Sequence, residues 1–372
     1  MQRQVKRYYS EKGAGMIKVA VIGVGKFGTN ILNTFSQLET EGRCKLVAIC
    51  DINETLLESQ SKKYNVRGYT DYKEMLEKES IDGVAVATPD PFHREPVVYA
   101  ANRGKHIFVE KPMDITVEGC QEMIDACRKN NVLLQVDFHK RFDPFHIKVR
   151  SDVQEGTIGQ VEYGYSHMED KIVVPRDWFP GWAPKSSPVW FLGVHMFDLI
   201  RWIIGSNGKS VYAKGRKIKL KSLGVDTYDF ISAMVEFENG SVVTFDLSWI
   251  LPEDFESIVN QGFRLVGENG IIECDSQDRG TRVSYEGKGM ATYNPVFISE
   301  EPDRRTGKIR YSGYGIESIA DFVYNLEYLS KGGRLEELKG GITGLGEDGI
   351  EVTKIAVAIH RSLESGKIEP VK

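Results

Sequence analysis

The chain has 372 residues, of which 41% are hydrophobic and 27% are charged, and its net charge is −5. This length exceeds one ordinary core and suits two domains. The acidic balance argues against nucleic acid or an anionic membrane as a partner. No apolar run approaches the roughly 18 residues that a membrane span needs. Five cysteines without a CxxC pair favour reduced thiols and a cytoplasmic location over disulfides or a zinc site.

Residues 1–15 are basic and lack the apolar segment of a signal peptide, so we expect a flexible tail before Met16. Short apolar runs then alternate with helical patterns. The runs lie at 17–23, 45–51, 83–88, 106–111 and 132–138, and helical patterns at 26–38, from 54, 91–104 and 116–131. Apolar strands separated by helices are typical of a parallel sheet covered on both faces. We therefore expect a doubly wound α/β domain over 16–138.

The pattern changes after about residue 140, where apolar and polar residues alternate. These segments lie at 161–169, 211–220, 228–249 and 263–275. Asn239-Gly240 and Asn269-Gly270 are typical hairpin turns. We expect an α+β domain over 139–345 with a mostly antiparallel sheet and a helix at about 315–330. A further helix and a tail are expected over 346–372.

The stretch GVGKFG at 23–28 is a GxGxxG motif that follows a predicted strand and opens a predicted helix. In that context Gly23 permits a tight turn and Gly25 lets backbone amides approach a pyrophosphate. Gly28 allows close packing of helix on strand, and the helix N-terminus favours phosphate. Asp51 ends the next strand and would bind ribose hydroxyls while repelling a 2′-phosphate. The motif predicts a Rossmann domain that binds NAD in preference to NADP, the alternative being a glycine turn without a ligand.

The strand at 106–111 ends in Glu110, Lys111 and Pro112. Carboxyl ends of parallel strands gather over the cofactor crevice, so Lys111 is expected to point at the nicotinamide. There it would hydrogen-bond a substrate hydroxyl and help to withdraw its proton. A plain salt bridge to Glu110 or another carboxylate is the alternative. The expected cofactor contacts are Gly23, Gly25, Lys26, Phe27, Gly28, Asp51, Ile52, Thr88, Pro89, His93, Glu110 and Lys111.

These motifs carry a family resemblance. GVGKFG, ATPDPFH at 87–93, VEKP at 109–112, DFHKRFDP at 137–144, GVHMFDLIRWIIG at 193–205 and the segment 348–371 occur in this order. The chain therefore resembles the glucose–fructose oxidoreductase / inositol dehydrogenase (GFO/IDH/MocA) family. The resemblance implies a Rossmann domain and a second domain with a large open sheet. It also implies sheet-to-sheet pairing into homodimers or homotetramers, bound NAD(H) or NADP(H), and catalysis by Lys111 and His195.

His195 suits that role because imidazole titrates near neutrality, and Asp198 three residues on would orient the ring. A packed core histidine is the alternative. One departure concerns the DxGxH arrangement that is common in the family, because Phe191 stands where the aspartate is expected. Asp170 and Asp177 are the candidates for the missing carboxylate.

A second departure lies in the segment 137–144. Asp137 stands where the family has a small residue, so Asp137, His139 and Arg141 are expected to supply hydrogen bonds that relatives place elsewhere. The segment 168–195 holds three tryptophans, whose rings would stack on a sugar or, alternatively, pack in a subunit contact. The expected substrate contacts are His139, Arg141, Asp170, Asp177, Trp178 and Trp190. The histidine spacing indicates no metal site.

The resulting hypothesis is an NAD-dependent dehydrogenase that acts on a secondary alcohol of a sugar, glycoside or inositol, with Lys111 and His195 handling the hydroxyl proton. Two alternatives remain. One is a relative with tightly bound NAD that eliminates or hydrolyses a glycoside without net redox change. The other is a non-catalytic sensor that binds dinucleotide.

Overall fold

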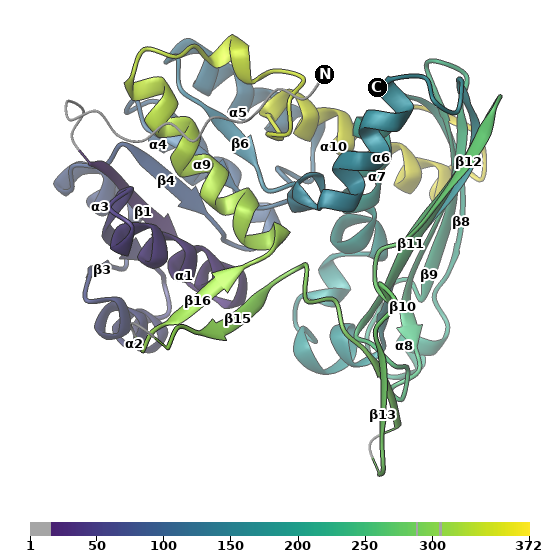
Figure 1. The fold of residues 1–372 in the computed structure, drawn as a ribbon, viewed down its shortest axis with the longest axis horizontal. Helices are drawn as coiled ribbons and strands as arrows, with labels where there is room; N and C mark the ends of the chain where they lie inside the picture. The colour runs from purple at the N-terminus through teal and green to yellow at the C-terminus, as the bar shows by residue number, and fades with distance from the viewer. Residues whose placement is uncertain (1–15, 288, 305–306) are drawn as a thin grey trace.

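The first domain is built on a six-stranded parallel sheet (Figure 1). The structure is a computed structural model that describes residues 16–287, 289–304 and 307–372, so the expected tail at 1–15 lies outside it. The strand order is β3-β2-β1-β4-β5-β6, and every pair is parallel. The strands are β1 (Ile17–Ile22), β2 (Cys44–Cys50), β3 (Arg67–Tyr69), β4 (Gly83–Val86), β5 (His106–Val109) and β6 (Leu134–Val136). This confirms the doubly wound sheet.

Helices cover both faces of this sheet, which explains why β4 is apolar throughout and β1 is apolar except for the exposed Lys18. Val19 and Val21 pack with residues of α1 and α9, whereas Ala20 and Ile22 belong to the cluster that includes α4 and α5. The helices are α1 (Lys26–Thr40), α2 (Glu54–Tyr64), α3 (Tyr72–Lys78), α4 (Arg94–Ala101), α5 (Val117–Lys129) and α9 (Tyr314–Ser330). Helix α9 thus joins the first domain, although its residues lie in the range expected for the second.

The second domain is built on a seven-stranded sheet with the order β12-β11-β7-β10-β9-β8-β17. Adjacent strands of this sheet pair antiparallel, except β7 and β10, which pair parallel. The prediction of a mostly antiparallel sheet is confirmed. The strands are β7 (Val161–Lys171), β8 (Gly208–Arg216), β9 (Phe230–Phe237), β10 (Val242–Leu251), β11 (Val259–Gly267), β12 (Gly270–Asp275) and β17 (Glu369–Pro370). Both predicted hairpins form. The strand expected to reach residue 220 ends at Arg216, and the four-residue helix α8 (Lys219–Ser222) follows.

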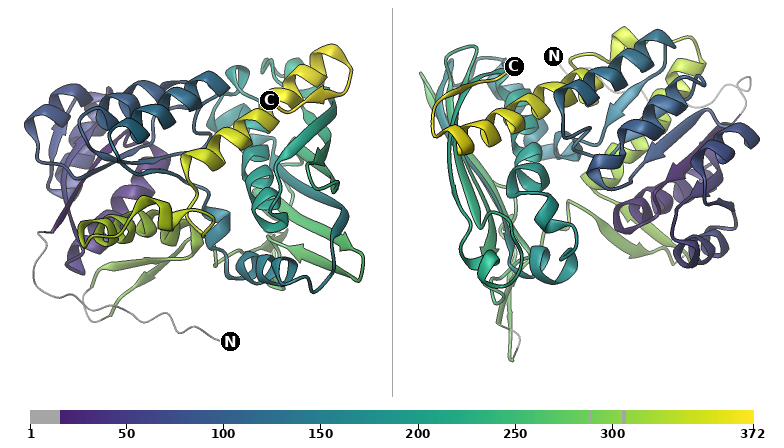
Figure 2. Two further views of the ribbon diagram at one scale, coloured as in Figure 1. Left: turned by 90° about the horizontal axis from the view of Figure 1, so that it is seen from above. Right: turned by 180° about the vertical axis from the view of Figure 1, so that it is seen from behind.

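Helices lie on one face of the second sheet and, among the described residues, its other face carries none (Figure 2). The helices of this half are α6 (Pro144–Gln154), α7 (Val194–Ile204) and α10 (Gly346–Ser365). Two small hairpins extend from it, β13 (Arg282–Tyr285) with β14 (Gly289–Thr292) and β15 (Ser299–Pro302) with β16 (Ile309–Ser312). The second hairpin reaches α1, where Tyr311 exchanges two backbone hydrogen bonds with the Gln37 amide.

Helix α10 connects the two halves. Its first turn lies against β6, where Leu345 forms a bridge with Gln135, and Thr353 donates to the carbonyl of Asp114 at 3.1 Å. Its last turns lie against β8, where the Ser362 hydroxyl accepts from the Ala213 amide at 2.9 Å. The helix therefore fixes the carboxyl ends of the parallel strands beside the second domain.

Candidate active site

The glycine turn between β1 and α1 has the geometry that dinucleotide binding needs. Gly23 has φ +87°, and a Cβ there would lie 2.5 Å from the carbonyl oxygen of Ala87. A Cβ on Gly28 would lie 2.0 Å from the carbonyl oxygen of Gly23, so helix and turn approach too closely for any side chain. Gly25, by contrast, has nothing within 4 Å of its Cβ position, and no side chain caps the helix that it precedes. The turn therefore leaves an open space, next to uncapped backbone amides, in which a pyrophosphate can bind.

Asp51 follows the last residue of β2 and lies beside the glycine turn. Its Oδ2 accepts from the Val24 amide at 2.9 Å, and its Oδ1 accepts from the Asn53 amide at 2.9 Å. These two bonds fix the carboxylate beside the glycine turn, while Ile52 is almost fully exposed next to it. The arrangement fits the ribose and adenine of a dinucleotide.

A tryptophan of the second domain lies over the glycine turn. The Lys26 ammonium is 4.1 Å from the centre of the Trp178 ring and 5.9 Å from that of Phe179. Both aromatic residues come from the segment between β7 and α7, which begins with the π-helical turn Val174–Trp178. Trp178 thus lies on the cofactor side of the site, although it was expected to bind substrate.

The loop that follows β4 is tied to the loop that follows β5 by His93. Its Nδ1 lies 2.8 Å from the carbonyl oxygen of Pro112, and its Nε2 lies 2.7 Å from that of Thr88. The ring is buried, so it orients these loops rather than facing a ligand itself. Pro89 begins the short 3₁₀ helix at Asp90–Phe92, and the Thr88 hydroxyl donates to the carbonyl of Phe92 at 3.0 Å.

Lys111 leaves the end of β5 and points at the second domain. Its Nζ donates to the carbonyl of Phe191 at 3.2 Å and lies 4.8 Å from the Phe191 ring centre and 5.8 Å from that of Phe27. The side chain is nearly buried, with 7% of the residue exposed. The expected alternative, a simple salt bridge to Glu110, is not observed among the described ion pairs. Lys111 therefore joins the glycine-turn side of the first domain to the segment that precedes α7.

His195 is the second residue of α7 and is 6% exposed. Burial lowers the pKa of its imidazole well below the usual range, and the charge of Lys111 lowers it further. Its buried Nδ1 has no hydrogen-bond partner among the described residues. The prediction that Asp198 orients this ring is wrong, because both oxygens of Asp198 accept from Arg141, at 2.8 and 2.5 Å. The site therefore presents an uncharged imidazole at neutral pH.

Asp170 places a carboxyl group near Lys111. Phe191, which stands where the family has an aspartate, contacts Lys111 only through its backbone carbonyl and its ring. Asp170 lies on the inward face of β7 and is 2% exposed. Burial raises its pKa to about 8, and the charges of Lys111 and Lys140 partly oppose that shift. Its Oδ2 has no hydrogen-bond partner among the described residues. The carboxyl group can therefore hold or release a proton near neutral pH.

A second group of buried carboxyls lies behind Lys111. Burial raises the pKa of Glu110 well above its usual range, as does the neighbouring carboxylate of Asp137, to which Glu110 is hydrogen-bonded. Asp137 accepts from the Ser318 hydroxyl, and its Oδ2 is 3.9 Å from Nδ1 of His139. The His139 ring in turn lies 4.7 Å, centre to centre, from that of His195. Asp137 and His139 therefore lie next to His195, and their role at the site stays a prediction.

Lys140 is a site residue that sequence reasoning missed. It is buried, its ammonium donates to Oε1 of Gln261 on β11, and burial lowers its pKa to about 7. Its neighbours His139 and Arg141 were named from the sequence instead, because a lysine beside an arginine gives no local signal of burial. The structure separates the two, since Arg141 lies between Asp198 and Asp348.

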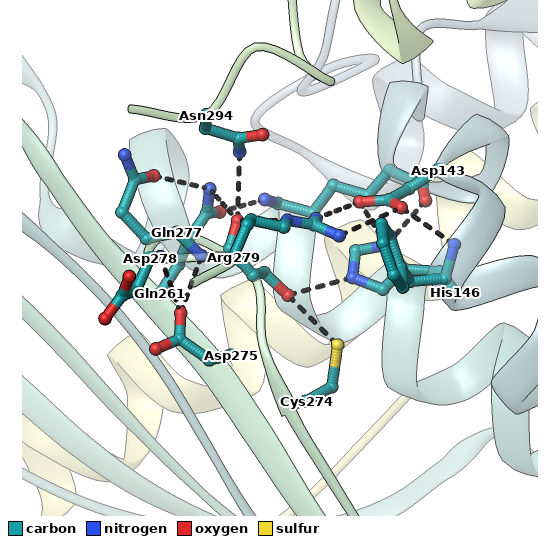
Figure 3. A network of polar contacts seen from close by, with 12 residues as sticks. Asp143, His146, Gln261, Cys274, Asp275, Gln277, Asp278, Arg279 and Asn294 are labelled. Atoms are coloured by element: carbon teal, nitrogen blue, oxygen red, sulfur yellow. Dashed lines mark hydrogen bonds and ion pairs between the residues drawn. The ribbon is translucent and has the colours of Figure 1, made fainter. Parts of the chain in front are cut away.

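The short 3₁₀ helix His139–Phe142, which carries His139 and Lys140, is anchored by a polar network (Figure 3). Asp143 ion-pairs with Arg279 and begins α6 by accepting from the Phe145 amide. His146 lies 2.8 Å from the Lys140 carbonyl and 2.9 Å from the hydroxyl of Ser276, and burial lowers its pKa to about 4. The neutral ring and the buried ion pair hold this segment against β12.

Three residues that were expected to bind substrate are occupied elsewhere. Arg141 is fully buried in its two carboxylate contacts. Trp190 stacks on His360 of α10, 5.4 Å between ring centres, so its face is taken up by the helix rather than free for a sugar. Asp177 forms a surface ion pair with Arg176, and its side chain is 46% exposed. In the described part of the chain no group of acidic, cysteine and histidine residues could hold a metal ion.

The glycine turn and the buried proton-carrying groups define a dinucleotide-dependent oxidoreductase. Residues 17–138 match the family described as an oxidoreductase family with an NAD-binding Rossmann fold, and residues 146–273 match the GFO/IDH/MocA C-terminal domain. The chain belongs to the GFO/IDH/MocA family. The family resemblance and the expected class of enzyme are both confirmed. No helix in the described residues has the length and apolar character to span a membrane.

Relatives cover most of the chain. The myo-inositol 2-dehydrogenase of Thermotoga maritima is 26% identical over 95% of this chain and 99% of its own length. The D-glucoside 3-dehydrogenase of Escherichia coli is 30% identical over 66% of this chain and 74% of its own. The structure of scyllo-inositol dehydrogenase from Lactobacillus casei with NAD(H) and scyllo-inositol has a TM-score of 0.77 at 19% identity, over 96% and 99% of the two chains. It supports the fold.

Proposed function

We propose that the protein is an NAD-dependent dehydrogenase that oxidises a secondary alcohol of an inositol, sugar or glycoside. The observation that carries this proposal is the grouping of three nearly buried residues, Lys111, His195 and Asp170. The charge of Lys111 acts on the pKa of both other groups, and its Nζ lies 5.8 Å from the ring centre of Phe27 in the glycine motif. Relatives named for myo-inositol and D-glucosides support the substrate class.

Each of the three groups has a defined task. The Lys111 ammonium, which is hydrogen-bonded to the Phe191 carbonyl in this structure, donates to the substrate hydroxyl. This bond holds the hydroxyl-bearing carbon of the substrate next to the dinucleotide site. The neutral His195 ring accepts the hydroxyl proton, and Asp170 keeps a proton below pH of about 8 and can supply it to a carbonyl in the reverse reaction. NAD, when bound, supplies the hydride acceptor.

The proposal also specifies the nucleotide. Asp51 faces the ribose position with a carboxylate fixed by two backbone amides, so a 2′-phosphate would meet negative charge there. We expect NAD to be preferred to NADP by at least about tenfold in kcat/KM, and Asp51→Ser to reduce that preference.

The five cysteines are all unpaired, which suits the reducing cytoplasm.

The test is a panel of inositols, glucosides and free sugars assayed with NAD by absorbance of the reduced nicotinamide. Because a positioned acid–base group contributes about 10²–10⁴ in rate, Lys111→Ala and His195→Ala should lose turnover by factors in that range while retaining NAD binding. His360→Ala, on α10, is the matched control for loss of a buried imidazole. Absence of cofactor reduction by wild-type protein across the whole panel would contradict the proposal.

A second candidate is an enzyme that keeps its NAD and transforms a glycoside without net redox change. The contact of Trp178 with Lys26 favours it, because an aromatic residue over the glycine turn slows exchange of the dinucleotide. NAD retained through purification, together with glycoside turnover that needs no added nucleotide, would distinguish this activity from the first.

We also propose that the chain forms a homodimer or homotetramer through the second sheet. That sheet has one face without helices in the described residues, and exposed apolar side chains lie on it: Tyr163, Tyr165 and Met234. An open antiparallel face with exposed large side chains is commonly covered by a partner.

A further inference from the structure

A proton taken from a buried substrate must leave the site. Lys111, His195 and Asp170 are exposed by 7%, 6% and 2%, so none of them exchanges protons freely with water. A group that contacts one of them and still reaches solvent is needed.

His139 is such a group. Its ring lies 4.7 Å from the ring of His195, and 14% of its side chain is exposed. On its other side lie the rings of Phe297 and Tyr314, at 5.1 and 5.7 Å, which fix the plane of the imidazole. His139 thus lies next to the buried base and is itself partly exposed.

The carboxylate of Asp137 lies next to Nδ1 of His139. Oδ2 of Asp137 lies 3.9 Å from Nδ1 of His139, and Asp137 is itself held by the Ser318 hydroxyl and by Glu110. Two carboxyl groups joined by a hydrogen bond share one proton, so the pair carries a single negative charge. That charge favours the tautomer of His139 with its proton on Nδ1, which leaves Nε2 as an acceptor.

We propose that His139 is a second acid–base group of the site, which passes the substrate proton from His195 to water and is oriented by the Asp137–Glu110 pair. This rests on the proposed dehydrogenase activity. In oxidation the hydroxyl O–H bond breaks as its proton goes to His195. The carbon C–H bond breaks as a hydride leaves with two electrons for bound NAD⁺, and a ketone forms. The proton then moves to His139 and to solvent, so one proton is released in each turnover.

The electrostatics agree with this direction. Burial lowers the pKa of His139, as it does that of His195, so both rings are uncharged and able to accept a proton near pH 7. The charged groups that act on His139 are Asp137, which opposes the shift, and Lys140 and Lys111, which add to it. The positive charges promote release of the proton once His139 has received it.

The kinetic test uses His139→Gln and His139→Ala. Both should lower kcat by about ten- to a hundredfold, with NAD affinity unchanged, and imidazole in the buffer should restore part of the rate of His139→Ala. The solvent deuterium isotope effect on kcat should rise, because proton release becomes limiting. His106→Gln, at the first residue of β5 and so at the strand end opposite Lys111, is the matched control and should show neither effect. Wild-type turnover in His139→Gln across the pH range would overturn the proposal.

A second measurement needs no substrate. In ¹⁵N-histidine-labelled protein without ligand, Asp137→Asn should lower the pKa of His139, and His139→Gln should raise that of His195, since each protonated ring disfavours the other. If wild-type protein showed no turnover but both pKa shifts were observed, the proposed dehydrogenase activity would be refuted, while the coupling between His139 and His195 would stand. A His195 pKa that is unmoved in His139→Gln would refute the coupling itself.

Discussion

Asp170 is our candidate for the carboxylate that the family pattern places at the position of Phe191. It lies on β7 of the large sheet, and burial raises its pKa to about 8. As pH rises through that value the carboxylate becomes a proton acceptor, so we expect alcohol oxidation to increase between about pH 7 and 9. Asp170→Asn should remove this rise in a pH profile of kcat/KM. A profile that keeps the same rise would assign it to another group.

The same residue has a predictable effect on stability. Because its folded pKa is raised above the unfolded value, the native state holds a proton that the unfolded state loses, and this contribution declines as pH rises from about 4 to about 8. Asp170→Asn should therefore unfold at a higher temperature than wild type at pH 9, and the gain should shrink at pH 5. Differential scanning calorimetry at the two pH values measures it. Asp246→Asn, on β10, serves as a control.

Individual residues were predicted unevenly from the sequence. The glycine turn, Asp51 and Lys111 follow a strand end or a helix start, and local patterns place such positions well. Long-range partners do not follow from such patterns. The sequence put Asp198 on the same helix face as His195, but it could not show that Arg141, 57 residues away, occupies that carboxylate.

At the scale of elements, the segment between β7 and α7 contacts the glycine motif through Trp178 and Lys26, and we expect it to affect how NAD is held. Trp178 is 45% exposed and contacts the Lys26 ammonium, so we expect Trp178→Ala to weaken NAD binding by about three- to tenfold, mainly through faster dissociation. Stopped-flow displacement of bound NAD measures this rate. Tyr328→Ala, an exposed aromatic on α9, should leave it unchanged. Equal rates in wild type and Trp178→Ala would show that the ring does not cover the nucleotide.

Elements were predicted best where periodicity is strong. The five apolar runs of the first domain and the two asparagine–glycine hairpins all form as expected. The hairpins β13–β14 and β15–β16 were not predicted, because β15 is acidic and almost fully exposed and neither hairpin has an apolar face. The contact of Gln37 with the backbone of Tyr311 holds the second hairpin, and a single glutamine gives no sequence signal for that.

For the whole molecule, the proposed assembly through the open face of the second sheet can be tested by a substitution on that face. Met234→Arg would place a charge among exposed aromatic side chains, and we expect it to shift the protein to a smaller species in light scattering after gel filtration. Ile218→Arg, which is exposed outside the strands, is the control. An unchanged mass for Met234→Arg, with a wild-type mass above one chain, would place the contact on another surface.

Helix α10 gives the molecule a mechanical constraint. One continuous rod of 20 residues begins at the edge of the nucleotide domain and ends on the far sheet. Because α10 packs against β6 at one end and β8 at the other, we expect it to limit the relative motion of the two halves. The separation of Lys111 and His195 should then change little during turnover.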